Sequence, residues 1–339
     1  LKNEGLLPLK KNIKKLAVIG PNAKEAQIIG GGSASLRPHY QIHPLEALRQ
    51  RLGHETEILY SKGCHTHKYL PKINEKLMGD KSGFLVEYFD GNQFYENLIL
   101  EERLIGSKFW VFEGFAKDVI SKEGRPNTSV KFSCEYTPDI SGSHEFEIFG
   151  IGQCRLLING KELIDNWTST DPGEAFFTFG SAAKKGVAKF QKGETYKIEV
   201  QYYFEGSFPA VYIGCQPPDE VDIFQEAIET ASNADEVLLI VGTNSDWETE
   251  GNDRADFNLP ANQNKLIEAI LEANQNTVIV INTGSPVHMP WSKKANSIVQ
   301  TWFGGQEFGN ALVDILSGEV NPSGKLPTTF PANIEDTPA

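Results

Sequence analysis

Two glutamates separated by a single residue could transfer protons. Glu248 and Glu250 lie in an acidic segment that also contains an aromatic ring and a glycine, with the sequence Trp247-Glu248-Thr249-Glu250-Gly251-Asn252-Asp253-Arg254. Carboxyl groups act as general acids and general bases when a structure positions them against a substrate. The same residue types also form solvated acidic turns, so residue types alone leave both interpretations open.

The acidic segment follows a run that is typical of a buried parallel strand. Residues 237–242 form a continuous apolar stretch that ends in glycine, with the sequence Val-Leu-Leu-Ile-Val-Gly. Open α/β sheets bind their ligands outside the carboxyl ends of their strands. We therefore expect the loop that leaves this strand, residues 243–254 and termed the acid loop, to lie at a ligand-binding edge.

Both ends of the chain predict an α/β fold. Apolar runs alternate with segments of helical periodicity, which predicts strands at residues 16–20, 57–60, 237–242, 277–281 and 298–303, and helices at residues 43–52, 222–232, 261–273 and 308–316. Residues 81–217 instead show short alternating segments separated by turn signals, a pattern typical of an antiparallel β-sandwich; the predicted strands are residues 85–89, 129–137, 144–149, 155–159, 196–204 and 210–215. The predicted fold is a flavodoxin-like α/β sandwich with a mostly parallel sheet, formed by residues 1–80 and 218–339 and interrupted by the inserted β-sandwich.

The charge of the chain limits its partners. The 339 residues carry a formal net charge of -13. This acidity disfavours nucleic acid and anionic membranes as main partners and is compatible with a neutral sugar. No apolar run approaches the roughly 20 residues of a membrane helix. The sequence leaves the localisation undetermined, and it leaves a homo-oligomer open.

The cysteines and histidines do not predict a metal site. The four cysteines are far apart and follow no zinc-type spacing; they are Cys64, Cys134, Cys154 and Cys215. We expect buried free thiols, with a disulfide between Cys134 and Cys154 on neighbouring predicted strands as the alternative. The stretch Cys64-His65-Thr66-His67 lacks further ligands at useful spacing, so we expect an exposed loop there. The sequence predicts no metal and no cofactor.

Five motifs occur in an order that is similar to a known family. They are Leu1-Lys2-Asn3-Glu4-Gly5-Leu6-Leu7-Pro8-Leu9, Gly30-Gly31-Gly32-Ser33-Ala34-Ser35, the acidic segment, Trp302-Phe303-Gly304-Gly305-Gln306-Glu307-Phe308-Gly309-Asn310-Ala311 and Pro322-Ser323-Gly324-Lys325-Leu326-Pro327. Together they resemble the second domain of glycoside hydrolase family 3, the β-glucosidase family. On residues 155–161 and 164–167 the insert resembles the protective-antigen (PA14) type β-sandwich of some β-glucosidases. Related adhesin modules hold calcium with adjacent aspartates, but residues 150–153 contain no acid here, so no calcium is predicted.

The resemblance implies roles for the acid loop and for the glycine loop, residues 30–35. In a retaining glycosidase one carboxyl group attacks the anomeric carbon and a second acts as acid and then as base. By motif position Glu250 is the acid/base. Glu248 is the alternative acid, and it otherwise contacts the substrate or orients the loop by a hydrogen bond. Gly30 to Gly32 would let the backbone approach the sugar and Ser33 would offer it a hydroxyl; a plain turn is the alternative.

The nucleophile of this family is expected outside the chain, on an N-terminal catalytic barrel that is missing here. Ser245-Asp246-Trp247 matches the nucleophile motif of that barrel, but it follows a second-domain strand and runs directly into the acid/base motif. We interpret Asp246 as a local loop residue. The chain alone is expected to be inactive, because removing one of two essential carboxylates costs many orders of magnitude in rate.

The inserted sandwich offers aromatic side chains that could stack on a sugar. Trp167 and the run Phe176-Phe177-Thr178-Phe179-Gly180 are candidates for an aromatic wall around an outer subsite. Phe177 is the first choice within this run, and Trp167 is the second substrate-binding candidate. The alternative is that these rings fill the core of the sandwich.

Three functions remain open from the sequence. The first is part of a retaining exo-β-glucosidase that hydrolyses terminal non-reducing β-D-glucosyl residues, with β-glucosides or β-linked oligosaccharides as partners. The second is a non-catalytic carbohydrate-binding module centred on the sandwich. The third, a nucleotide-binding protein, rests on the glycine loop alone, and this loop lacks both the lysine of a P-loop and the spacing of a dinucleotide fingerprint.

Overall fold

The chain folds into two compact units. The computed structural model describes residues 1–79, 83–120, 127–251 and 253–337. The first unit, termed the α/β unit, comprises Leu1–Lys68 and Val221–Ala339, and the second, the sandwich unit, comprises Tyr69–Glu220. The fold is therefore mixed α/β with several sheets, and one unit is inserted into the other along the sequence.

The α/β unit is built on one six-stranded sheet. Its order is β1-β16-β15-β14-β2-β3, and all pairs are parallel except β1 with β16. The strands, in sheet order, are Lys2–Asn3, Ser297–Gln300, Thr277–Asn282, Glu236–Gly242, Lys15–Ile19 and Glu57–Ser61. The central strands β14 and β15 are buried along their whole length, which explains why they consist of continuous apolar runs.

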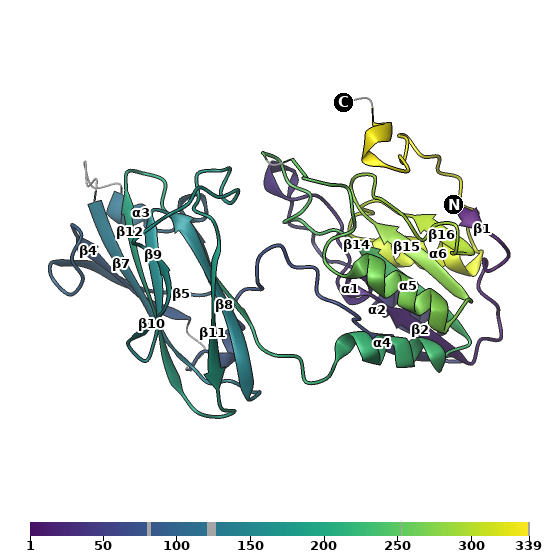
Figure 1. The fold of residues 1–339 in the computed structure, drawn as a ribbon, viewed down its shortest axis with the longest axis horizontal. Helices are drawn as coiled ribbons and strands as arrows, with labels where there is room; N and C mark the ends of the chain where they lie inside the picture. Colours follow the sequence, from purple (N-terminus) through teal and green to yellow (C-terminus); the bar gives the residue numbers. More distant parts are fainter. Residues whose placement is uncertain (80–82, 121–126, 252, 338–339) are drawn as a thin grey trace. The chain divides into compact units, whose positions relative to one another are not determined.

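Helices cover both faces of this sheet (Figure 1). The helices are α1 Pro21–Lys24, α2 Pro44–Leu52, α4 Ile223–Ser232, α5 Gln263–Ala273 and α6 Phe308–Ser317. The side chains of α1, α2 and α6 share one hydrophobic core with the sheet, and those of α4 and α5 share a second core on its opposite face. The sequence signals for helix ends are confirmed: Pro44 begins α2, and Gly318 ends α6 in the left-handed conformation with φ of 79°.

The sandwich unit consists of two antiparallel sheets that enclose one core (Figure 1). The six-stranded sheet has the order β10 Lys161–Asn166, β9 Gln153–Ile158, β12 Tyr196–Glu205, β7 Asn127–Tyr136, β4 Phe84–Asp90 and β5 Leu98–Leu104. The four-stranded sheet has the order β11 Lys184–Phe190, β8 Gly142–Ile151, β13 Ala210–Gln216 and β6 Lys108–Trp110. Alternate residues of the strands face the core, which is the packing expected of two face-to-face sheets.

The boundaries between the two units along the sequence differ from the predicted boundaries. The structure divides the chain after Lys68 and after Glu220, whereas the predicted boundaries follow residues 80 and 217. The first difference has a clear physical cause, because residues before position 80 belong to the sandwich. The backbone N–H of Leu70 donates to the carboxylate of buried Glu147 at 2.6 Å, and Ile73 lies in the sandwich core.

The cysteines are free thiols. The alternative disulfide is wrong, because Cys134 on β7 and Cys154 on β9 are not on neighbouring strands: β12 lies between them. They pair with Ile198 and Tyr202 of that strand, four residues apart. Two strand spacings of about 4.8 Å each exceed the Cα separation that a disulfide allows.

The structure also corrects the expected exposed loop at residues 64–67. Cys64 is buried, and the rings of His65 and His67 stack with centroids 5.2 Å apart. The carbonyl of Thr66 accepts a hydrogen bond from the indole nitrogen of Trp247 in the acid loop. Within the described ranges, no three or more His, Cys, Asp or Glu side chains are grouped so as to hold a metal ion, and no helix has the length and apolar character needed to cross a membrane.

The burial of the thiols leads to a testable expectation. Burial raises the pKa of Cys64, Cys134, Cys154 and Cys215 to about 12. Because the thiolate is the reactive form, only about one thiol in ten thousand is ionised at pH 8. We expect a disulfide reagent such as Ellman's to react negligibly with the native protein at pH 8 and to titrate four thiols per chain in 6 M guanidinium chloride. Rapid reaction of the native protein would contradict this burial.

Candidate functional site

The candidate site lies at the carboxyl edge of the parallel sheet. The acid loop leaves β14 at Gly242, the glycine loop follows β2 and α1, and residues 283–285 follow β15. These three strands are neighbours in the sheet, so their carboxyl ends meet at one edge.

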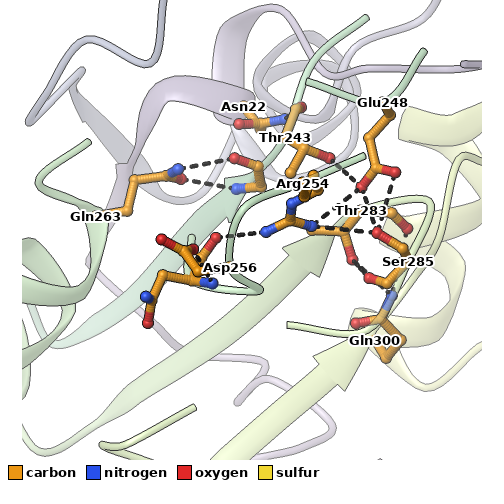
Figure 2. Close-up of polar contacts among 11 residues, drawn as sticks. Asn22, Thr243, Glu248, Arg254, Asp256, Gln263, Thr283, Ser285 and Gln300 are labelled. Carbon is orange, nitrogen blue, oxygen red and sulfur yellow. Dashed lines mark hydrogen bonds and ion pairs between the residues drawn. The ribbon is translucent and has the colours of Figure 1, made fainter. Parts of the chain in front are cut away.

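The last residue of β14, Gly242, is hydrogen-bonded at this edge to the side chain of a buried glutamine, Gln263 of α5. The side-chain Oε1 of Gln263 accepts from the backbone N–H of Gly242, and its Nε2 donates to the Gly242 carbonyl, both at 2.8 Å. Nε2 also donates to the carbonyl of Pro260. Gln263 is fully buried, so its amide supplies the backbone partners that a further strand residue would otherwise provide (Figure 2).

A second buried amide joins three segments beside it. Asn282, the last residue of β15, accepts from the side chain of Asn22 at 3.0 Å and from the backbone N–H of Gln27 at 2.9 Å. Its Nδ2 donates to the carbonyls of Gln27 and Trp302. This role has no signal in the sequence, because an asparagine at the end of a strand is also typical of an ordinary turn.

The glycine loop packs directly against the acid loop. The backbone N–H of Gly31 donates to the carbonyl of Glu248 at 2.8 Å. A Cβ on Gly31 would lie 2.2 Å from the carbonyl oxygen of Ser245, and a Cβ on Gly32 would lie 3.0 Å from the Glu250 side chain. The glycines therefore permit the close approach of the two loops, since any larger residue at position 31 would collide with the backbone.

Glu250 is exposed and is held by Ser33. The backbone N–H of Ser33 donates to Glu250 Oε1 at 3.1 Å, and its hydroxyl donates to Oε2. Ser33 is itself exposed. Two of the predicted site residues therefore meet, although 217 positions separate them in the sequence.

Glu248 has a different environment from Glu250. Only 13% of its side chain is exposed. Its carboxylate accepts hydrogen bonds from the hydroxyl of Thr243 at 3.0 Å and from the hydroxyl of Ser285 at 2.9 and 3.0 Å, and the Arg254 guanidinium lies 3.8 Å away (Figure 2). The carboxylate of Glu248 is thus bonded within the acid loop and to the loop after β15. Its partners Thr243 and Ser285 were not predicted from the sequence.

Trp247, the aromatic residue of the acid loop, attaches this loop to residues 64–67. Trp247 donates from its indole nitrogen to the carbonyl of Thr66 at 2.8 Å, and the Lys68 ammonium lies 5.6 Å from its ring centroid. Exposed Asp246 lies on the preceding turn, where its backbone N–H donates to Asn244 at 3.0 Å. Asn252 of this loop lies outside the described residues.

A comparison of the sequence with models of protein families shows which family the chain belongs to. The model of the glycosyl hydrolase family 3 C-terminal domain matches residues 1–339, which is the whole chain. The chain belongs to this family.

Relatives of the family 3 chain are longer proteins. It is 34% identical over 346 residues to a β-glucosidase of Rhizobium radiobacter and 37% identical over 361 residues to a probable β-glucosidase I of Emericella nidulans; both alignments cover the whole chain, and 41% and 42% of these relatives. The crystal structure of a β-glucosidase from Kluyveromyces marxianus in complex with glucose is similar, with a TM-score of 0.85, 32% identity, and coverage of 100% of this chain and 42% of that one. The chain therefore spans about two fifths of the length of the curated relatives it matches.

The sandwich unit of the family 3 chain places the two predicted aromatic candidates on opposite faces. Trp167 packs on the outer face of the six-stranded sheet, with its ring 5.8 Å from Phe94 and 5.2 Å from the Arg155 guanidinium. Phe177 lies 5.5 Å from Trp110, which is on the outer face of the four-stranded sheet because its neighbour Phe109 faces the core. One sugar residue cannot contact both Trp167 and Phe177.

Phe177 also has an unusual backbone. Phe176, Phe177 and Thr178 have φ values of 53°, 59° and 68°, so three consecutive residues other than glycine are left-handed. The side chain of Phe177 is 43% exposed and that of Phe179 is 75% exposed. These rings do not fill the sandwich core, and left-handed backbone of this kind is concentrated at functional sites.

The amide of Gln263 can be tested by substitution. We expect Gln263→Leu to lower the free energy of unfolding by about 3 kcal/mol, because it leaves the buried polar groups of Gly242 without partners. Urea unfolding followed by circular dichroism would measure the change. The matched control is Gln275→Leu at an exposed position just after α5, where a change within about 0.5 kcal/mol is expected. Equal effects at both positions would refute the role of Gln263.

Proposed function

We propose that this chain supplies the general acid/base of a retaining exo-β-glucosidase, and that Glu250 is the residue. The observation that carries the proposal is the exposed Glu250 carboxylate at the carboxyl edge of the sheet, held there by both donors of Ser33. Similarity over the whole chain to β-glucosidases supports the reaction class. The substrates would be terminal non-reducing β-D-glucosyl residues.

The proposed reaction needs a second carboxylate. In the first step Glu250 donates a proton to the glycosidic oxygen while a nucleophilic carboxylate attacks the anomeric carbon, and in the second step Glu250 takes a proton from the attacking water. We propose that the nucleophile comes from a barrel domain in the part of the full-length protein that this chain does not span. Asp246 is a poor candidate for the nucleophile, because it lies on the same loop as Glu250. Its backbone N–H donates to the side chain of Asn244 in a local turn.

The hydrogen bonds from Ser33 to Glu250 are compatible with both steps of the proposed reaction. It donates from its backbone to one oxygen of Glu250 and from its hydroxyl to the other. When Glu250 carries the catalytic proton on one oxygen, the other oxygen can keep its donor from Ser33 and so hold the orientation of the carboxyl group. Ser33 would then act on the acid/base as well as, or in place of, the sugar.

The aromatic loop of the sandwich unit is the proposed outer subsite. We propose that the insert is a PA14-like domain and that Phe177 stacks on the sugar beyond the glycosidic bond, supported by its exposed ring and the left-handed backbone that presents it. The second function, a carbohydrate-binding module, would use the face that carries Trp167, whose half-buried ring lies beside Phe94 and Arg155.

The acid/base assignment is tested in the full-length enzyme by Glu250→Gln. We expect kcat for p-nitrophenyl β-D-glucoside to fall by about 10²–10⁴-fold, because the amide can neither donate nor accept the catalytic proton. Azide should restore turnover of substrates with activated leaving groups and yield β-glucosyl azide, since an anionic nucleophile needs no general base. Near-normal turnover without azide would refute the assignment, and Asp246→Asn serves as the control, with activity expected within a few-fold of the wild type.

The two faces of the sandwich are tested by Phe177→Ala and Trp167→Ala in the same enzyme. If Phe177 forms the outer subsite, its loss should lower kcat/KM for cellobiose and cellotriose by about tenfold, as expected for about 1.4 kcal/mol of lost stacking. Trp167→Ala should leave these values unchanged. The opposite result, together with weaker binding of the Trp167 variant to insoluble glucan, would favour the carbohydrate-binding module.

A further inference from the structure

Glu248 and three polar side chains around it form one connected cluster. Thr243, Glu248 and Arg254 belong to the acid loop, whereas Ser285 belongs to the loop after β15. Ser285 is thus the one member that ties the acid loop to the neighbouring strand (Figure 2).

The hydrogen bonds of this cluster have a defined direction. The Arg254 guanidinium has no acceptor and donates to the Ser285 hydroxyl at 3.2 Å. The single hydroxyl proton of Ser285 is then donated to Glu248, whose two oxygens lie 2.9 and 3.0 Å away. Glu248 must be the acceptor, and as a carboxylate it also balances the charge of Arg254, 3.8 Å from it.

The cluster is itself anchored to the sheet. The hydroxyl of Thr283 donates to the carbonyl of Ser285 at 2.8 Å. The amide of Gln300, the last residue of β16, donates in turn to the Thr283 hydroxyl at 3.2 Å. The position of Ser285 is therefore fixed by hydrogen bonds that extend from β15 to β16 (Figure 2).

The same glutamate is fixed on its backbone side. The carbonyl of Glu248 accepts from Gly31 of the glycine loop at 2.8 Å, two residues from the point where Ser33 holds Glu250. The acid loop is thus attached to the glycine loop through the backbone of Glu248 and to the β15 loop through its side chain. Glu250, two residues further along, has its carboxyl group bonded only to Ser33 in the described part of the chain.

We propose that Ser285, Arg254 and Glu248 are positioning residues for the acid/base Glu250. This inference rests on the proposed function of Glu250. The cluster fixes where the backbone of the acid loop runs, and so sets the distance of the Glu250 carboxyl group from the leaving-group oxygen. Without it the fold persists, but the carboxyl group spends less time where proton transfer can occur, and a displacement of about 1 Å costs about 100-fold in rate.

The test compares leaving groups in the full-length enzyme. A series of aryl β-D-glucosides runs from 2,4-dinitrophenyl, which departs without proton assistance, to phenyl, which requires it. For Ser285→Ala we expect kcat/KM to fall about 10- to 100-fold for the phenyl glucoside and less than about threefold for the dinitrophenyl glucoside. Ser285→Thr keeps the hydroxyl and should restore most of the phenyl glucoside activity.

A matched control separates this role from general damage. Ser297→Ala removes another buried hydroxyl of the same sheet, which donates to the carbonyl of Lys2 at 3.2 Å, and should leave the whole series unchanged. If Ser285→Ala lowers kcat/KM equally for all leaving groups, or for none, the positioning role is overturned. Should Ser285→Ala fail to accumulate as folded protein, Glu248→Gln, which keeps the shape of the side chain and removes its charge, decides the question by the same comparison.

Glu250→Gln in the same series distinguishes the inference from the function on which it rests. If Glu250→Gln shows the strong dependence on the leaving group and the Ser285 and Glu248 variants do not, the acid/base assignment stands and the positioning role fails. If Glu250→Gln shows no such dependence, the proposed function fails and the positioning role fails with it. Dependence in all three variants, strongest for Glu250→Gln, is the expected result.

Discussion

The α/β unit depends on the parallel pairing of β2 with β14. The two strands come from parts of the chain that the whole sandwich unit separates, and they pair from Leu16 with Glu236 to Ile19 with Leu239. The approach is close: a Cβ on Gly20, whose φ is 117°, would lie 2.1 Å from the carbonyl oxygen of Ile240. A long insertion opposes this pairing only weakly, because each doubling of loop length costs about 0.6 kcal/mol in closure entropy. The two hydrophobic cores that flank the sheet supply the stabilisation.

This pairing has a direct consequence for the candidate site. Since the strands are parallel neighbours, the glycine loop after β2 and the acid loop after β14 emerge at the same edge. The hydrogen bond from Gly31 to Glu248 and those from Ser33 to Glu250 join them there. The site is thus made by the sheet order, and neither loop contains it alone.

The two glutamates of the acid loop differ in their exposure to solvent, because different groups surround them. A carboxylate withdrawn from water is costly unless donors replace the lost hydration. Glu248 has such donors in Thr243 and Ser285 and a balancing charge in Arg254, and it can therefore be largely buried. Glu250 keeps its contact with solvent, which leaves its carboxyl group accessible to a substrate.

In the sandwich unit the period of two decides which aromatic rings reach solvent. Alternate residues of each strand face the core, so residues that look equivalent in the sequence project from opposite faces. Trp110 and the exposed Phe177 share the outer face of the four-stranded sheet, whereas Trp167 lies on that of the six-stranded sheet with Arg155. Three left-handed residues cost roughly 1–3 kcal/mol each, so the surrounding structure must stabilise the conformation that presents Phe177.

The sequence by itself determined most of the α/β architecture. Continuous apolar runs predicted β2, β14 and β15, and proline and glycine marked the ends of α2 and α6, because these signals are local. It determined less of the sandwich: β5, β6, β10 and β11 were not predicted, since these are the edge strands of the two sheets and are stabilised mainly by their partners. The sequence also indicated the acid loop and Ser33 through the family resemblance.

Only the tertiary structure decided how these residues are combined. Ser285, Asn282 and Gln263 carry no local signal, because each acts through a hydrogen bond to a residue that is distant in the sequence. The separation of Cys134 from Cys154 by β12, and of Trp167 from Phe177 by the thickness of the sandwich, follows from strand order, which local periodicity does not specify. Side-chain types and their local spacing are properties of the sequence, whereas the donors that surround a carboxylate are set by which distant strands become neighbours.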